Sequence, residues 1–195
     1  LAPSEMCIRD SHHTYPNSAK LSVKKWEFDL GWAWIKLFSF LRLARVARVA
    51  PIAHRVEGKH SLDMDTAMAI LNNRFQIMAQ YRKLVIAPLV KQEVAKADES
   101  VRHLFRRAKR LLSRETSLLQ DRHHVRIDSM LAHSQALKVI YEKRLALQQI
   151  WAKTSANGHD MLAAIKDWVH EAEASGIQSL KEFAAQLKTY SLRPA

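Results

Sequence analysis

The sequence has little of what turns, sheets and disulfide frameworks require. Its 195 residues include only 4 glycines and 5 prolines, a composition that favours helix over sheet. The single cysteine, Cys7, excludes an internal disulfide framework. No secretory signal is apparent, and no run of about 18 apolar residues is free of charges, so no membrane span is predicted. Taken alone, these features indicate a soluble or peripheral helical protein.

Common catalytic motifs are also missing, whereas positive charge is abundant. The chain has no internal repeat, no glycine-rich phosphate loop and neither a GxSxG nor a CxxC motif. Its formal net charge is +12, and 48% of its residues are hydrophobic. Such a charge balance predicts an anionic neighbour, either nucleic acid or a membrane surface with acidic lipid.

The chain divides by composition into four segments. Residues 1–11 lack periodicity and resemble a translated sequencing adapter, so we expect a non-native scar there. Residues 12–51 are rich in aromatic and basic side chains, and residues 52–60 form a linker beside Pro51. Residues 61–195 carry apolar side chains at helical spacing, which predicts a helical C-terminal extension.

Within that extension the pattern predicts a few long helices and no strand. We expect helices over residues 61–88, 90–119 and 122–154, with Pro88 bending or ending the first. Asp160 and Gly176 bound another helix, which pairs with the last one as a hairpin. The run RHLFRRAKRLLSR is dense in cations and could contact phosphate or acidic lipid, or be merely a solvated helix face.

The stretch from residue 27 to residue 49 predicts an amphipathic helix. Aromatic and leucine side chains occupy one face, and basic side chains recur on another. This arrangement suits a membrane headgroup boundary, but a core-facing helix of a soluble domain has the same pattern. The candidate membrane-surface residues are Trp32, Trp34, Lys36, Arg42 and Arg45.

Two adjacent histidines, His12 and His13, open the native part of the sequence. Neighbouring side chains on a helix point about 100° apart, so such a pair serves two metal ions better than one. A second pair, His123 and His124, lacks convergent carboxylate or histidine partners and is interpreted as surface residues.

The segment from HHTYPNSAKLS to LARVARVAP resembles the third histidine box of bacterial membrane fatty acid desaturases and the helix that follows it. This resemblance implies a fragment of a di-iron, oxygen-dependent oxidoreductase that acts on a fatty acyl chain with an electron-donor protein. His12 and His13 would be iron ligands, and the box's first position is occupied by Arg9.

The same resemblance implies a membrane enzyme whose fragment lies on the cytoplasmic face, against an anionic membrane surface. The transmembrane catalytic core is missing, so the fold expected here is all-α: an interfacial amphipathic helix followed by a helical bundle or hairpin. We expect this isolated chain to retain no iron and to be inactive as an acyl-CoA or acyl-lipid desaturase.

The alternative is a basic helical module that binds nucleic acid. Residues 61–195 also resemble the helical tail of certain insertion-sequence transposases, through HSQALKVIYEKRLALQQIW and the final hairpin. On this interpretation the partner is DNA, and binding weakens steeply with ionic strength.

Overall fold

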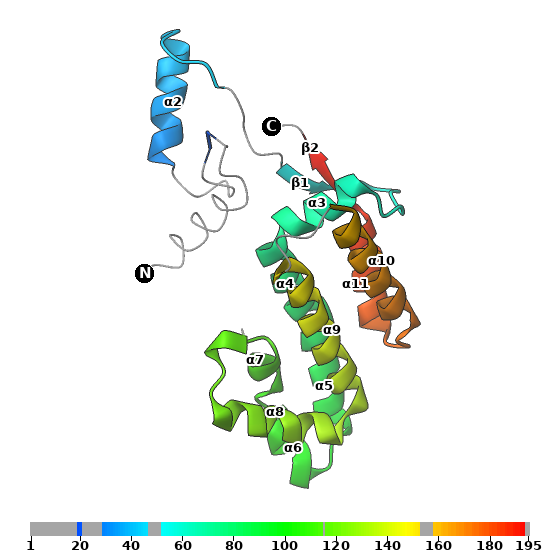
Figure 1. Cartoon of the computed structure of the whole chain (residues 1–195). Coiled ribbons are helices and arrows are strands. Elements are labelled where there is room, and N and C mark those ends of the chain that lie inside the picture. Colours follow the sequence, from blue (N-terminus) through cyan, green and yellow to red (C-terminus); the bar gives the residue numbers. More distant parts are fainter. Residues whose placement is uncertain (1–18, 21–28, 47–51, 115, 153–157, 194–195) are drawn as a thin grey trace. The chain divides into compact units, whose positions relative to one another are not determined.

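The computed structural model describes residues 19–20, 29–46, 52–114, 116–152 and 158–193. It confirms the predicted all-α class, since almost every element is a helix (Figure 1). The chain forms two compact units. The helical unit comprises residues 56–190, and the smaller unit contains the elements before residue 56 together with the last residues of the chain.

The smaller unit contains α2 (Leu30–Phe40), the strand β1 (Ile52–Arg55) and all but the first residue of the strand β2 (Tyr190–Arg193). The two strands pair as a two-stranded sheet. Asp29 caps α2 by accepting a hydrogen bond of 2.9 Å from the backbone N–H of Trp32. The helix ends at Phe40, and Arg42 takes the left-handed conformation with φ at 59°. The amphipathic helix is therefore shorter than the predicted stretch of 27–49 within the described residues.

The helical unit is a succession of mostly short helices (Figure 1). They are α3 (Met64–Asn72), α4 (Arg74–Tyr81), the π-helical turn η1 (Arg82–Ile86), α5 (Ala87–Lys96), α6 (Glu99–Phe105), α7 (Ala108–Leu112), the 3₁₀ turn η2 (Thr116–Leu118), α8 (Asp121–His133), α9 (Gln135–Ala152), α10 (Gly158–Ala174) and α11 (Gln178–Lys188).

The long helices expected from periodicity are broken at polar positions. Asn73 ends α3, Asp98 precedes α6, and Ser134 adopts an extended conformation between α8 and α9. At the last of these breaks the side chain takes part, because the hydroxyl of Ser134 accepts a hydrogen bond of 3.2 Å from the backbone N–H of Leu137 in the first turn of α9. Pro88 does not end a helix, because the backbone stays helical from α4 through the π-helical turn η1 into α5, and the wider turn lies just before Pro88. The prediction that no strand is present is also wrong. Each of the strands β1 and β2 has only four residues, which is too short for an alternating pattern to be recognised in the sequence.

An aromatic cluster forms the centre of the helical unit. The rings of Tyr81, Trp168 and Phe183 meet edge to face, with centroids 5.0 to 6.5 Å apart. The hydroxyl of Tyr81 donates to the carbonyl of Ile140 at 2.6 Å, and the indole N–H of Trp168 donates to the carbonyl of Lys143 at 2.8 Å. The cluster therefore joins α4, α9, α10 and α11, and each buried aromatic contributes roughly 1.5–3 kcal/mol.

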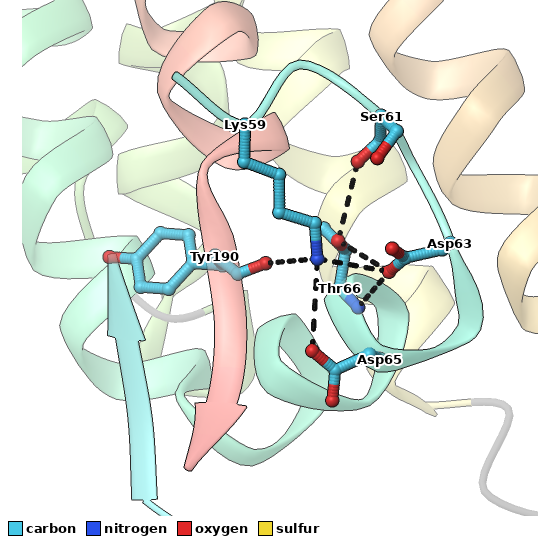
Figure 2. Close-up of polar contacts among 6 residues, drawn as sticks. All are labelled: Lys59, Ser61, Asp63, Asp65, Thr66 and Tyr190. Carbon is cyan, nitrogen blue, oxygen red and sulfur yellow. Dashed lines mark hydrogen bonds and ion pairs between the residues drawn. The ribbon is translucent and has the colours of Figure 1, made fainter. Parts of the chain in front are cut away.

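A polar clasp around Lys59 joins the two ends of the helical unit (Figure 2). The ammonium of Lys59 lies 3.1 Å from Asp63, 3.7 Å from Asp65 and 3.3 Å from the carbonyl of Tyr190. Asp63 in turn is the N-cap of α3: its carboxylate accepts hydrogen bonds of 2.8 Å from the backbone N–H and the hydroxyl of Thr66. The clasp fixes the start of α3 beside Tyr190, the second residue after α11.

No helix among the described residues is both long enough and apolar enough to cross a membrane.

Candidate nucleic-acid interface

Positive charge is concentrated in one part of the helical unit, residues 102–126, which we call the basic arm. It runs through α6, α7 and the first half of α8, and these helices gather at the end of the unit far from α3 (Figure 1). Its 25 residues contain eight lysines and arginines but only two acidic residues. The arm therefore carries half of the chain's formal net charge of +12.

Local helix periodicity directs these charges outward. Phe105, Ala108, Leu111 and Leu112 are buried at three- and four-residue spacing, so one face of α6 and α7 packs against the neighbouring helices. The intervening side chains of Arg106, Arg107, Lys109 and Arg110 are exposed. The apolar stripe therefore packs the arm against the rest of the unit, and the cations between the apolar positions remain exposed to solvent, where an anion can bind.

A buried arginine fixes the far end of α7. Arg144 of α9 is 3% exposed, and its guanidinium donates to the carbonyls of Ser113 and Arg114 at 3.2 and 2.8 Å. These carbonyls follow the last turn of α7, where the helix leaves acceptors unsatisfied and its dipole favours a cation. Arg144 is therefore an anchor of the basic arm, although it lies about 30 residues away in the sequence.

His123 lies among the cations of the arm. Its Nδ1 accepts a hydrogen bond of 3.0 Å from the backbone N–H of Gln120, which closes a capping box at the start of α8. Desolvation lowers the pKa of His123 below its ordinary value of 6.5, and nearby cations lower it further. These cations are Arg114, Arg122, Arg126 and His124. The second histidine pair is thus part of a positive surface.

A groove of about 650 Å³ lies between η1 and α5 on one side and the α6–α7 turn on the other. Four of its nine lining residues are cations, Lys83, Lys91, Arg106 and Lys109, and none is acidic. The other five are apolar and include Val94 and Phe105. Within the part of the chain that the structure describes, no carboxylate lies within ion-pair distance of these four cations.

The predicted metal ligands His12 and His13 lie outside the described residues. Among the residues that are described, no group of three or more His, Cys, Asp or Glu side chains could hold a metal ion.

The predicted membrane-surface residues all lie in the smaller unit, but they do not share one helix. Trp32, Trp34 and Lys36 belong to α2, whereas Arg42 and Arg45 follow its end. Lys36 lies over the ring of Trp32 at 5.6 Å, and Trp34, which is 51% exposed, stacks on Phe38 at 6.0 Å. The left-handed turn at Arg42 breaks the continuous basic face that the sequence pattern predicted.

Comparison with known proteins separates the two family resemblances found in the sequence. The profile of a family described as transposase, the ISL3 type of DDE transposase, matches residues 64–193, which is about two thirds of the chain. The chain belongs to this transposase family.

A curated relative supports the same assignment. The transposase for insertion sequence element IS1001 of Bordetella parapertussis is 28% identical over 123 residues. This alignment covers 62% of the present chain but only 30% of the relative, so the chain spans less than a third of that protein. No solved structure matches.

The transposase match overturns the desaturase assignment and what depended on it. The assignment as a fatty acid desaturase fragment, the acyl desaturase activity, the iron cofactor and the membrane localisation are all wrong on this evidence. Each came from the resemblance of residues 12–51, a short segment that lies before the matched range of 64–193. The fatty acyl substrate and the electron donor lose their support with it, and the nucleic-acid alternative agrees better with the family.

Two parts of the interface could not be identified from the sequence. Arg144 lies in a helix with a regular apolar period and has no local sign of burial. Lys83 and Lys91 are separated from the basic arm by a turn, and only the fold brings them beside Arg106 and Lys109. The run RHLFRRAKRLLSR was the one sequence signal that pointed to this region.

Proposed function

We propose that the chain binds DNA as part of an insertion-sequence transposase, and that the basic arm is its contact surface. The observation that supports this most is the concentration of exposed cations between residues 102 and 126, with only two acidic residues among them. A duplex presents closely spaced phosphates, and a protein that neutralises them gains affinity by releasing condensed counterions. The family and the IS1001 relative agree with a DNA partner.

The uneven distribution of charge over the helical unit favours one defined contact surface over nonspecific electrostatic binding at any surface. Residues 158–188, which form the α10–α11 hairpin, contain five acidic residues and three lysines. A phosphate backbone is repelled by that hairpin and attracted by the basic arm, so the unit has one preferred orientation on DNA.

The test is the affinity of the full chain for a random 30-base-pair duplex, measured by fluorescence anisotropy between about 50 and 200 mM salt. A triple variant, Arg107→Gln, Arg110→Gln and Arg126→Gln, removes three exposed cations of the basic arm. The matched control, Lys138→Gln, Lys166→Gln and Lys181→Gln, removes three exposed cations elsewhere in the same unit.

The wild type should bind with an affinity that falls steeply with salt. The arm variant should bind about tenfold or more weakly, with a slope of log affinity against log salt that is smaller by about 2.7. The control should keep most of the affinity and of the slope. Equal losses in the two variants, or a wild type that ignores duplex DNA at low salt, would contradict the proposal.

A further inference from the structure

The groove between η1–α5 and the α6–α7 turn combines two properties that a simple phosphate-binding surface does not need. Its rim carries Lys83 and Lys91 on one side and Arg106 and Lys109 on the other. Its remaining lining is apolar, formed by five side chains that include Val94. The groove therefore offers four cations around an apolar floor.

The four cations are spaced along the groove, so they could contact successive phosphates of a nucleic-acid strand. Lys83 and Lys91 are eight residues apart, which is about two helical turns, and both line the groove from the η1–α5 side, about 12 Å from one another along the axis. Arg106 and Lys109 are separated by three residues across the start of α7 and face them from the opposite rim. A chain of phosphates lying along the groove meets a positive charge on both sides.

The apolar floor distinguishes between the two forms of DNA. A duplex presents phosphates and sugars on its outer surface and keeps the base faces stacked inside, so it gains nothing from an apolar floor. An unpaired strand exposes the faces of its bases, which can lie against apolar side chains while cations hold the backbone.

We propose that this groove binds an unpaired segment of a DNA strand, with phosphates at the four rim cations and a base against the apolar floor. The inference rests on the proposed DNA-binding function and names the form of DNA that this part of the surface takes.

The experiment compares three probes with the full chain: a thymidine 12-mer, the same backbone with abasic sites, and a duplex. One variant, Lys83→Gln with Lys91→Gln, removes two rim cations on the side away from the basic arm. A second, Val94→Ser, makes the floor polar without changing the charge. The control, Lys138→Gln with Lys166→Gln, removes two exposed cations outside the groove.

The rim variant should lose about five- to tenfold in affinity for the 12-mer, and its salt slope should fall by about 1.4, the value for two contacts to a single strand. Its affinity for the duplex should change by less than about twofold. The Val94→Ser variant should bind the 12-mer about three- to tenfold more weakly, as expected for a lost contact to a base. Its affinity for the abasic strand should be unchanged.

Two outcomes would overturn the inference in distinguishable ways. If the wild type binds the duplex but the rim variant loses duplex and 12-mer equally, or Val94→Ser affects both strands alike, the groove is not a site for unpaired DNA and the proposed function stands. If the wild type binds none of the three probes, the proposed function fails and this inference with it.

Discussion

The basic arm and the α10–α11 hairpin are both built from helices with one apolar face, yet their polar faces differ. In the hairpin, two of the carboxylates are paired: Glu173 pairs with Lys188 at 2.6 Å, and Glu171 pairs with Lys143 of α9. In the arm, eight cations face two acidic residues. Pairing stabilises a surface modestly, whereas an unpaired cluster of one sign repels itself and is useful only when an anion neutralises it.

The apolar sides of the two regions differ as well. The hairpin contributes Trp168 and Phe183 to the aromatic cluster at the centre of the unit. The arm buries smaller aliphatic side chains and Phe105, and it depends on Arg144 for the end of α7. Stability is therefore concentrated in the hairpin and charge in the arm, and each region can be perturbed separately.

The largest effect should come from the hairpin core. Phe183→Ala removes a fully buried ring that packs on Tyr81 at a centroid distance of 5.0 Å, and we expect the free energy of unfolding to fall by about 3–5 kcal/mol. Urea denaturation followed by circular dichroism measures this. The matched control is Phe75→Ala, which truncates a ring that is 47% exposed and should change stability by less than about 1 kcal/mol. Equal costs at the two positions would show that the hairpin is not the stable centre.

The second largest effect should come from Arg144, which links α9 to the end of α7 in the basic arm. Arg144→Met keeps an apolar stem but leaves the carbonyls of Ser113 and Arg114 without their charged donor, at a cost of about 1.5–3 kcal/mol. Hydrogen exchange in α7 should accelerate more than exchange in α11, because the lost contact lies at the end of α7. Lys138→Met, an exposed change on the same helix, serves as the control and should do neither. Uniform acceleration across both helices would argue against a local anchor.

How much of the fold and of the candidate interface could be predicted depends on how far apart in the sequence the contacting residues lie. The hairpin was predicted correctly because Trp168 and Phe183 lie on two adjacent periodic segments, joined by a turn in which Gly176 adopts a positive φ of 75°. The basic run of the arm was also visible. Local patterns cannot show that Arg144 reaches Ser113, or that Ser134 divides what looks like one long helix, because both depend on tertiary contacts and backbone geometry.

A smaller effect is expected from the clasp at Lys59. Partial burial tends to raise the pKa of Asp63, but the hydrogen bonds from Thr66 and the ammonium of Lys59 outweigh it and hold that pKa below its ordinary value of 3.8. A depressed carboxyl pKa stabilises the fold above the ordinary value, and this contribution disappears as the pH falls through the folded-state pKa.

Asp63→Asn tests this contribution, because asparagine keeps the N-cap and removes the charge. At pH 6 the variant should be less stable by under about 1 kcal/mol, since Asp63 is 49% exposed. The difference from wild type should vanish as the pH falls below 3.8. Thermal unfolding from pH 2 to pH 6 measures it, and a difference that persists at the acid end would assign the role of Asp63 to its shape and not to its charge.

The smallest effect is a change in titration without a change in fold. Because the cations of the arm lower the pKa of His123, phosphates that neutralise them should raise it. NMR titration of the histidine ring signals, with and without a duplex, measures the shift. His159 in α10 provides the control, since its ring signals should not move when DNA is added. A His123 signal that is indifferent to DNA would place the contact outside the arm.

The most direct test of the comparison is hydrogen–deuterium exchange of the full chain with and without a 30-base-pair duplex, at a salt concentration where binding is saturated. We predict slower exchange between residues 102 and 126 and unchanged exchange between residues 158 and 188. Protection of the hairpin with no protection of the arm would contradict the assignment of DNA binding to the basic arm.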